Sequence, residues 1–128
     1  MTPYFVLPAM IFAHIIADFN LQGWLANAKQ RAWWKKNAPA KEYRFDWIPS
    51  LFMHSVSWSF MIMLPLVIYY NFECSMFYVN SLILNTIAHM VFDHLKANVR
   101  IINLCDDQFL HMIQIVFTFV GTMIVGHI

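Results

Sequence analysis

The sequence predicts an all-α membrane protein: a four-transmembrane-helix bundle made of two pseudo-symmetric helical hairpins, with a short interfacial helix. Its composition is 60% hydrophobic and only 12% charged, whereas soluble domains carry about 25% charged residues. Four apolar stretches approach the roughly 20 residues that a membrane helix needs. Because 128 residues are enough for one domain, we expect residues 1–128 to form a single integral membrane domain.

We place the four spans at roughly residues 3–22, 50–72, 76–97 and 107–127. Pro3 and Pro8 lie in the first turns of the first span, where proline is tolerated, and Pro49 favours a helix start at Ser50. Pro65 lies inside the second span and should kink it. The first apolar segment lacks a basic leader and a small-residue cleavage site, so we expect a retained span rather than a signal peptide.

Positive charge predicts the orientation of these spans. All eight Lys and Arg residues lie in the connection between spans one and two or in that between spans three and four. By the positive-inside rule, both termini lie outside, and the protein is a multi-pass protein of the cytoplasmic (inner) membrane. Cys74 and Cys105 lie at opposite ends of the third span, too far apart to pair, so we expect two unpaired thiols.

The first connection contains an amphipathic segment. Residues 23–36 mix Trp24, Trp33 and Trp34 with four cations, which predicts a short helix at the level of the lipid headgroups. Residues 37–49 then form an irregular return in which Trp47 is another interfacial anchor. We favour membrane anchoring over a dedicated partner site. The lipid bilayer is thus the expected partner, and a net charge of +1 gives no reason to expect nucleic acid.

One polar signature occurs twice inside the apolar segments. Ala13-His14-x-x-x-Asp18 recurs as Ala88-His89-x-x-x-Asp93, and His and Asp four residues apart stand on one helix face. Each copy is followed by a histidine at the start of the next span, His54 or His111. This order predicts two hairpins related by a pseudo-two-fold axis along the membrane normal.

These polar residues lie at a similar depth, near the cytoplasmic ends of the spans. The same faces are extended by Gln22, Asp107, Asn85, Gln114 and Thr118. Ionisable residues inside a membrane are costly and mark functional sites, so we expect all four helices to contribute to one central site. His94 faces about 100° away from its neighbour Asp93 on a helix, and His127 lies at the outer end, so we expect neither to belong to the site.

Histidine nitrogen and aspartate oxygen are ligands that suit Zn²⁺, Mn²⁺ or Fe²⁺. The candidate metal ligands are His14, Asp18, His54, His89, Asp93 and His111, with Asp107 in reserve. These exceed the three or four ligands of one catalytic zinc. We therefore expect either two divalent transition-metal ions, or one ion with some carboxylates orienting the histidines. Asp18, Asp93 and Asp107 are the candidate catalytic groups, as ligands or as the general base.

Two other interpretations of the His/Asp pattern remain open. The pairs could join the helices by hydrogen bonds without a metal, or they could form a relay for protons or ions. We favour the metal site, because intramembrane charge is expensive to keep.

The polar blocks resemble a known family. His14-x-x-x-Asp18-Phe19-x-x-Gln22 is similar to the opening block of small membrane proteins known as the domain of unknown function 3307 family. The blocks at His54, at His89-x-x-x-Asp93-x-x-Lys96 and at Asp107-Gln108-x-x-His111 resemble that family's remaining polar blocks. The resemblance covers nearly the whole chain and implies a membrane protein. The His/Asp blocks alone also resemble those of membrane-bound metal-dependent hydrolases.

The sequence therefore predicts a metal-dependent hydrolase whose site opens near the cytoplasmic face and acts on a phosphoester or ester. A membrane-associated substrate could reach such a site laterally. Ser57 and Ser81 lack the context of a nucleophile, so covalent serine catalysis is not expected. The alternative is a non-enzymatic channel, transporter or effector. Four short helices can hardly enclose a pore, so conduction would require a homo-oligomer.

Overall fold

The computed structural model describes residues 2–73 and 75–125, and every regular element in these ranges is a helix. The four long helices are α1 (Pro3–Ile15), α4 (Trp47–Tyr69), α5 (Met76–His94) and α6 (Leu104–Val125). Two short helices, α2 (Leu25–Ala28) and α3 (Arg31–Asn37), and a 3₁₀ turn (Lys41–Tyr43) lie between α1 and α4. One π-helical turn, Ile16–Asn20, continues α1, and another, Leu95–Val99, continues α5. The predicted all-α class is confirmed.

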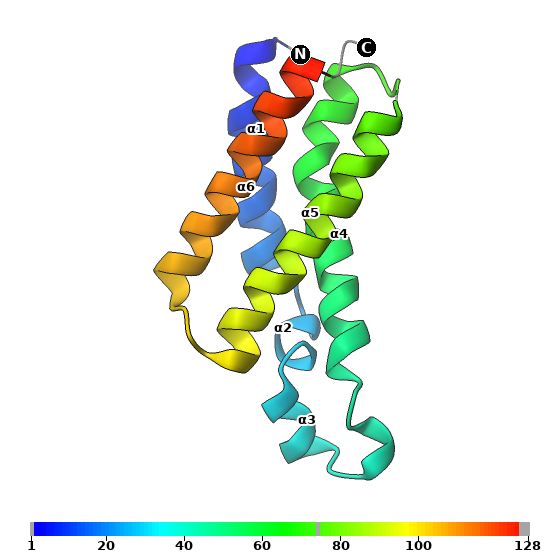
Figure 1. The fold of residues 1–128 in the computed structure, drawn as a ribbon, viewed down its shortest axis with the longest axis vertical. Helices are drawn as coiled ribbons and strands as arrows, with labels where there is room; N and C mark the ends of the chain where they lie inside the picture. Colours follow the sequence, from blue (N-terminus) through cyan, green and yellow to red (C-terminus); the bar gives the residue numbers. More distant parts are fainter. Residues whose placement is uncertain (1, 74, 126–128) are drawn as a thin grey trace.

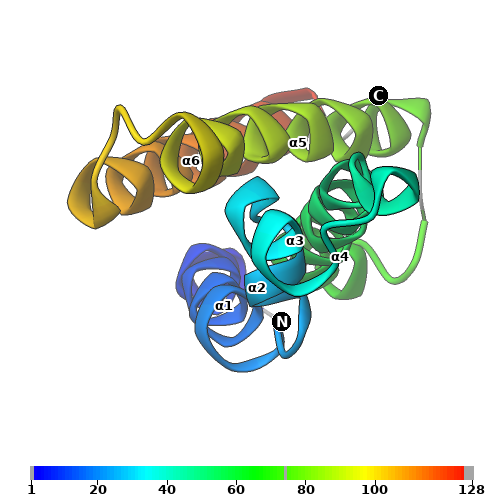
Figure 2. The same cartoon turned by 90° about the horizontal axis from the view of Figure 1, so that it is seen from below.

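The long helices form a closed ring. Helix α1 packs against α4 and α6, and α5 packs against the same two helices from the other side (Figures 1 and 2). The start of α1, the end of α4, the start of α5 and the end of α6 lie together at the top of Figure 1. The short helices and the turn from α5 to α6 lie at the bottom, and so do the segments that carry all Lys and Arg residues. The two basic connections therefore share one end of the bundle, called the basic end below.

Several helices begin or end a few residues away from the bounds of the predicted spans. Helix α4 begins at Trp47 rather than at residue 50, so Trp47 belongs to the helix and Pro49 lies in its first turn. Helix α6 begins at Leu104 rather than at residue 107, and its predicted end at residue 127 lies outside the described residues. The α1 segment ends at Asn20, and the α5 segment runs through its π turn to Val99. Proline in a first turn costs no intrahelical hydrogen bond, which explains the early start of α4.

Three helical segments among the described residues are long and apolar enough to cross a membrane. They are Pro3–Asn20, Lys41–Tyr69 and Leu104–Val125. Helix α5 has 19 residues but is more polar, because it carries Asn80, Asn85, His89 and Asp93. The structure thus supports three membrane-length helices directly, and the fourth predicted span is the one that carries the second His/Asp block.

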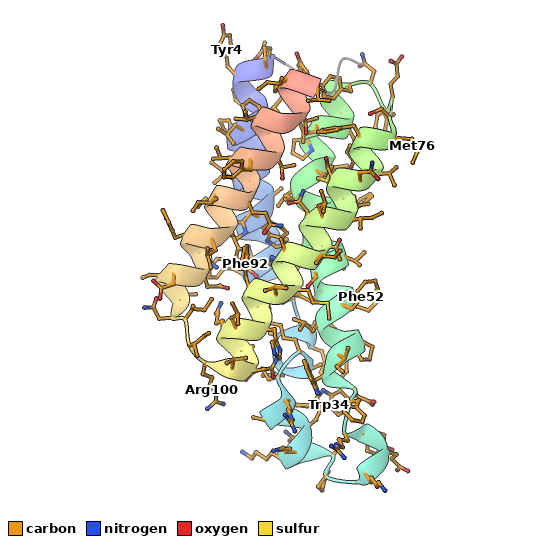
Figure 3. All side chains as sticks on the ribbon, in the orientation of Figure 1. Tyr4, Trp34, Phe52, Met76, Phe92 and Arg100 are labelled. Atoms are coloured by element: carbon orange, nitrogen blue, oxygen red, sulfur yellow. The ribbon has the colours of Figure 1, made fainter. Side chains whose placement is uncertain are left out.

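The bundle is polar inside and apolar outside at its basic half. Large apolar side chains are exposed, such as Phe52 (Figure 3), Leu84 and Phe117. Histidine, aspartate and asparagine side chains are buried between the helices. The other half has an apolar core that includes Val6, Ile62 and Leu66. A polar interior with a large exposed apolar surface suits a lipid environment, because such a surface is rare on soluble monomers.

The predicted interfacial segment 23–36 is two short helices rather than one. Trp24, Trp33 and Trp34 pack edge to face with ring centroids 5.1–6.0 Å apart. The end of α2 turns inward: Ala28 is fully buried, and Lys29 is only 7% exposed. This connection therefore closes the basic end of the ring and does not only lie on a surface.

Candidate metal centre

Three histidines from three helices direct their Nε2 atoms at one carboxylate, that of Asp93 on α5. The Nε2 atoms of His54 on α4 and His89 on α5 lie 3.2 Å and 3.7 Å from Asp93 Oδ2. The Nε2 atom of His111 on α6 lies 3.7 Å from Asp93 Oδ1. All four side chains are at least 97% buried. Residues far apart in the sequence thus converge on one point between the helices.

Two further aspartates complete the cluster. Asp18, in the π-helical turn after α1, places Oδ1 3.6 Å from His54 Nε2. Asp107, in the first turn of α6, places Oδ1 3.3 Å from His111 Nε2. The donor atoms form two groups, each with all its atoms within 4.8 Å of one another: Asp18, His54, His89 and Asp93, and Asp18, Asp107 and His111. Asp18 is shared by both groups. The three predicted catalytic aspartates therefore all lie in this cluster.

The donor spacing fits a divalent ion. Nitrogen and oxygen ligands about 2 Å from a tetrahedral ion lie about 3.3 Å from one another. The separations from His54 to Asp93 and from His111 to Asp107, 3.2 Å and 3.3 Å, match that spacing. In addition, Asp93 Oδ1, Asp107 Oδ1 and His111 Nε2 are buried without a hydrogen bond from any described residue. Buried polar atoms are normally satisfied, so these three atoms suit coordination to a cation.

Two lysines from the basic connections reach into the cluster. Lys29, directly after α2, places Nζ 2.6 Å from Asp93 Oδ2, and Lys96 places Nζ 2.6 Å from Asp107 Oδ2. Three aspartates contribute −3 and the two lysines +2, which leaves −1 before any histidine is protonated. Buried charges require such compensation. The sequence marks both lysines only as topology signals, because nothing in the sequence context of a loop lysine distinguishes a buried ammonium from an exposed one.

His14 lies beside the cluster, but it is absent from both donor groups. Trp58 Nε1 donates a 2.8 Å hydrogen bond to His14 Nδ1. Nε2 therefore carries the proton and donates to Gln108 Oε1 at 3.0 Å. Gln108 Nε2 in turn donates to Asp18 Oδ2 at 2.9 Å. In this arrangement His14 orients Gln108, which holds Asp18. Its predicted role as a metal ligand stays a prediction.

Stacked rings position the histidines. Trp58 stacks on His89 with centroids 4.1 Å apart, and His89 stacks on His111 with centroids 4.3 Å apart. The Nδ1 atoms of His89 and His111 have no hydrogen-bond partner among the described residues. Ring packing therefore positions both side chains, together with the 3.2 Å hydrogen bond between His89 Nε2 and His54 Nε2. Trp58 was not predicted, although it follows His54 by four residues and therefore shares its helix face.

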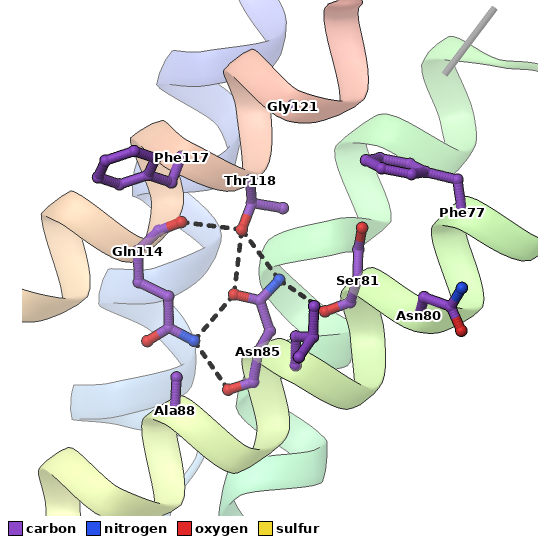
Figure 4. A pocket seen from close by; sticks show the side chains of 10 residues that line it. Phe77, Asn80, Ser81, Asn85, Ala88, Gln114, Phe117, Thr118 and Gly121 are labelled. Atoms are coloured by element: carbon purple, nitrogen blue, oxygen red, sulfur yellow. Dashed lines mark hydrogen bonds between the residues drawn. The ribbon is translucent and has the colours of Figure 1, made fainter. Parts of the chain in front are cut away.

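The remaining predicted polar residues lie in separate places. Gln22 Nε2 donates a long bond of 3.4 Å to Asp18 Oδ1. Asn85, Gln114 and Thr118 bond to one another between α5 and α6, one to two turns away from the histidines along each helix (Figure 4). His94 stacks on Trp47 and takes no part in the cluster, as expected.

The remaining predictions concern the two cysteines and His127. Cys105 is a free, exposed thiol. Cys74 and His127 lie outside the described residues.

Comparison with known proteins identifies the family of the chain. No curated protein and no solved structure matches the chain significantly. The looser resemblance to metal-dependent hydrolases therefore stays a prediction. The family model described as Protein of unknown function (DUF3307) matches residues 6–127, which confirms the resemblance of the polar blocks, and the chain belongs to that family.

Proposed function

We propose that the chain is a four-span integral membrane protein that holds a divalent transition-metal ion in its His/Asp cluster and hydrolyses a phosphoester or ester there. The observation that carries this proposal is the convergence of His54, His89 and His111 on Asp93, where the donor atoms fall into two groups, each within 4.8 Å. The net charge of −1 on the three aspartates and two lysines also favours binding of a cation. Zinc and manganese are the ions to test first, because both accept mixed nitrogen and oxygen ligands.

The membrane part of the proposal rests on the outer faces of the helices and on the placement of positive charge. Helix α5 would be the fourth span, since its polar side chains Asn85, His89 and Asp93 are buried in the ring while Ile83, Leu84 and Ile87 are exposed. All Lys and Arg residues lie at the basic end. By the positive-inside rule, this placement favours a cytoplasmic location of that end and an outer location of both termini. Residues 1–128 would then form one domain of the cytoplasmic membrane.

In this proposal, each residue of the cluster has one of three roles: ligand of the ion, general base or counter-charge. His54, His89, Asp93 and Asp18 would hold the ion, and His111 with Asp107 would form the second donor group. When bound, a divalent ion polarises a phosphoryl or acyl oxygen and makes water a nucleophile near neutral pH. Asp107 Oδ1, which has no hydrogen bond from a described residue, is the best-placed general base. Lys29 and Lys96 would offset part of the carboxylate charge, since they pair with the Oδ2 atoms of Asp93 and Asp107.

Access to the cluster requires movement at its rim. The aspartates and histidines are at most 4% exposed, whereas the Lys96 side chain is 30% exposed. Lys96 and the partly buried Gln108 lie at the basic end, next to Asp107. Swinging Lys96 away from Asp107 would open the cluster toward the headgroup level, where a membrane-associated substrate could enter.

A second candidate function is proton or ion passage, and one observation favours it. Polar residues continue beyond the histidines along α6: Gln114 and Thr118 bond to Asn85, and Thr122 Oγ1 donates to the Thr118 carbonyl. Tyr70 extends the track by donating to the Thr122 carbonyl at 3.1 Å. A buried polar track over most of the bundle length is the kind of path that a proton relay uses.

The test is metal-dependent hydrolysis by the protein purified in detergent. Ion-depleted protein is measured before and after addition of Zn²⁺ or Mn²⁺ on nitrophenyl esters of a carboxylic acid, a phosphomonoester and a phosphodiester. We expect turnover that requires the ion, is lost in Asp107→Asn and persists in the matched control His94→Ala. Ion-loaded protein without turnover on any of the three, together with proton uptake into vesicles that Gln114→Leu abolishes, would replace the hydrolase by the relay.

A further inference from the structure

We propose that the basic end of the bundle contains a binding site for the phosphate of an anionic phospholipid headgroup, centred on Arg31 and Lys35 of α3. Two cavities meet there, with volumes of about 220 Å³ and 330 Å³, and both are lined by these two side chains. Arg31 and Lys35 are four residues apart and share one face of α3. The site is separate from the metal centre, and its existence does not depend on a bound ion.

Positive charge is concentrated around these cavities. Lys41 and Arg44 line the smaller cavity, and Arg100 lines the larger one. Among residues 2–73 and 75–125, the Lys and Arg side chains that pair with a carboxylate are Lys29 and Lys96. The five cations that line the two cavities therefore have no carboxylate partner in these ranges. Like charges on one helix face repel each other. A phosphate bound between the cations would offset this repulsion, because its oxygens accept several charge-assisted hydrogen bonds.

The walls of the cavities are held by specific contacts. Asn98, in the π turn after α5, accepts a 2.7 Å hydrogen bond from the Arg31 backbone amide and donates to the Lys29 carbonyl. Trp34 Nε1 donates to the Ala28 carbonyl at 2.6 Å, and its ring stacks on Tyr43. Arg100 adopts a left-handed conformation with φ of 63°, which is unusual for a residue other than glycine. These contacts hold the backbone that carries the cations in a defined position.

The surroundings favour a lipid over a soluble phosphate compound. Trp34 and Arg100 lie at the basic end of the bundle (Figure 3). Trp24 and Phe45, more than half exposed, flank the region. Aromatic rings and clustered cations at this depth are typical of the headgroup layer, where anionic lipids attract Lys and Arg. The larger cavity is also next to the metal centre, because Lys29, two residues before Arg31, contacts Asp93.

The test measures binding of short-chain lipids to the full chain in neutral detergent, through the tryptophan fluorescence. The probes are a short-chain phosphatidylglycerol, the zwitterionic phosphatidylcholine of equal chain length, and inorganic phosphate. We expect saturable binding of phosphatidylglycerol at least about tenfold tighter than of the other two, which is the effect of one charge-assisted contact. Equal affinities for the two lipids would overturn the site. Phosphate binding as tightly as phosphatidylglycerol would overturn the assignment to a lipid.

Variants separate a built site from general surface charge. Arg31→Gln and Lys35→Gln should each weaken phosphatidylglycerol binding about tenfold, and Lys35→Arg should restore it. The matched control is Lys36→Gln, since Lys36 is exposed on the same helix but lines neither cavity. Circular dichroism and gel filtration confirm that each variant is folded. An equal loss in Lys36→Gln and Lys35→Gln would overturn the proposal.

Discussion

The Lys29 ammonium lies 2.6 Å from Asp93 Oδ2, although 64 residues separate the two in sequence. This contact joins the basic connection to the centre of the bundle, because the same carboxylate faces His54, His89 and His111. The connection is thus part of the site and not only a membrane anchor.

The first prediction concerns this ion pair. Lys29→Met removes the positive partner and leaves Asp93 undercompensated in ion-free protein, which should cost about 3–5 kcal/mol of stability. Thermal unfolding in detergent, followed by circular dichroism, measures the loss. Added Zn²⁺ should recover part of it, because the ion replaces the missing charge. The control Lys36→Met should unfold like the wild type, and an equal drop in both variants would show that general charge matters instead.

The second prediction separates His14 from the histidines of the donor groups. His14→Ala leaves Trp58 Nε1 without an acceptor, so it should lower the free energy of unfolding by about 1–3 kcal/mol. It should retain the bound metal, because both His14 nitrogens are already engaged with Trp58 and Gln108. His89→Ala should lose the metal. If His14→Ala loses as much metal as His89→Ala, His14 is a ligand, as its sequence pattern predicts.

The third prediction concerns the polar network between α5 and α6. Asn85→Ala removes the bonds to Gln114 and Thr118, which should lower stability by about 1–2 kcal/mol within a membrane bundle. Metal content should not change. Asn80→Ala is the matched control. Asn80 and Asn85 line one pocket between α5 and α6, but Asn80 is exposed (Figure 4). An equal loss of stability in Asn80→Ala and Asn85→Ala would show that the hydrogen bonds of Asn85 do not stabilise the bundle specifically.

The fourth prediction concerns orientation. Cys105 is exposed at the basic end, and a Cys74→Ser background leaves it as the single thiol. A membrane-impermeant maleimide should label it in inside-out vesicles and not in intact cells, because the positive-inside rule puts this end in the cytoplasm. Labelling of intact cells would reverse the orientation and put the metal centre on the outer side.

The sequence was sufficient to predict the residues that come together in the cluster. His89 and Asp93 share a face through their spacing of four residues, and His54 and His111 lie at the same depth, so their convergence follows from helix periodicity. Gln108 and Trp58 had weaker signals: one neighbours Asp107, and the other is one turn from His54. Both could have been found by extending the same face.

Other features could not be predicted from the pattern. The π-helical turn that holds Asp18 depends on long-range packing rather than on a sequence signal. Lys29 and Lys96 resemble ordinary loop cations, and only the inward turn of the chain after α2 reveals that one of them is buried. The pseudo-two-fold relation stays a prediction, and it is inexact in the sequence itself, because Asp107 precedes His111 by four residues whereas Ser50 occupies the equivalent position before His54.

The metal content of the purified protein tests the central claim most directly. The protein is isolated in detergent from cells grown with zinc and manganese, and elemental analysis gives the number of ions per chain. The account predicts about one ion per chain in the wild type and in His94→Ala, and almost none in His54→Ala and His89→Ala, provided that all four proteins remain folded. Folded wild-type protein that binds neither zinc nor manganese, even after incubation with each, would contradict the metal centre.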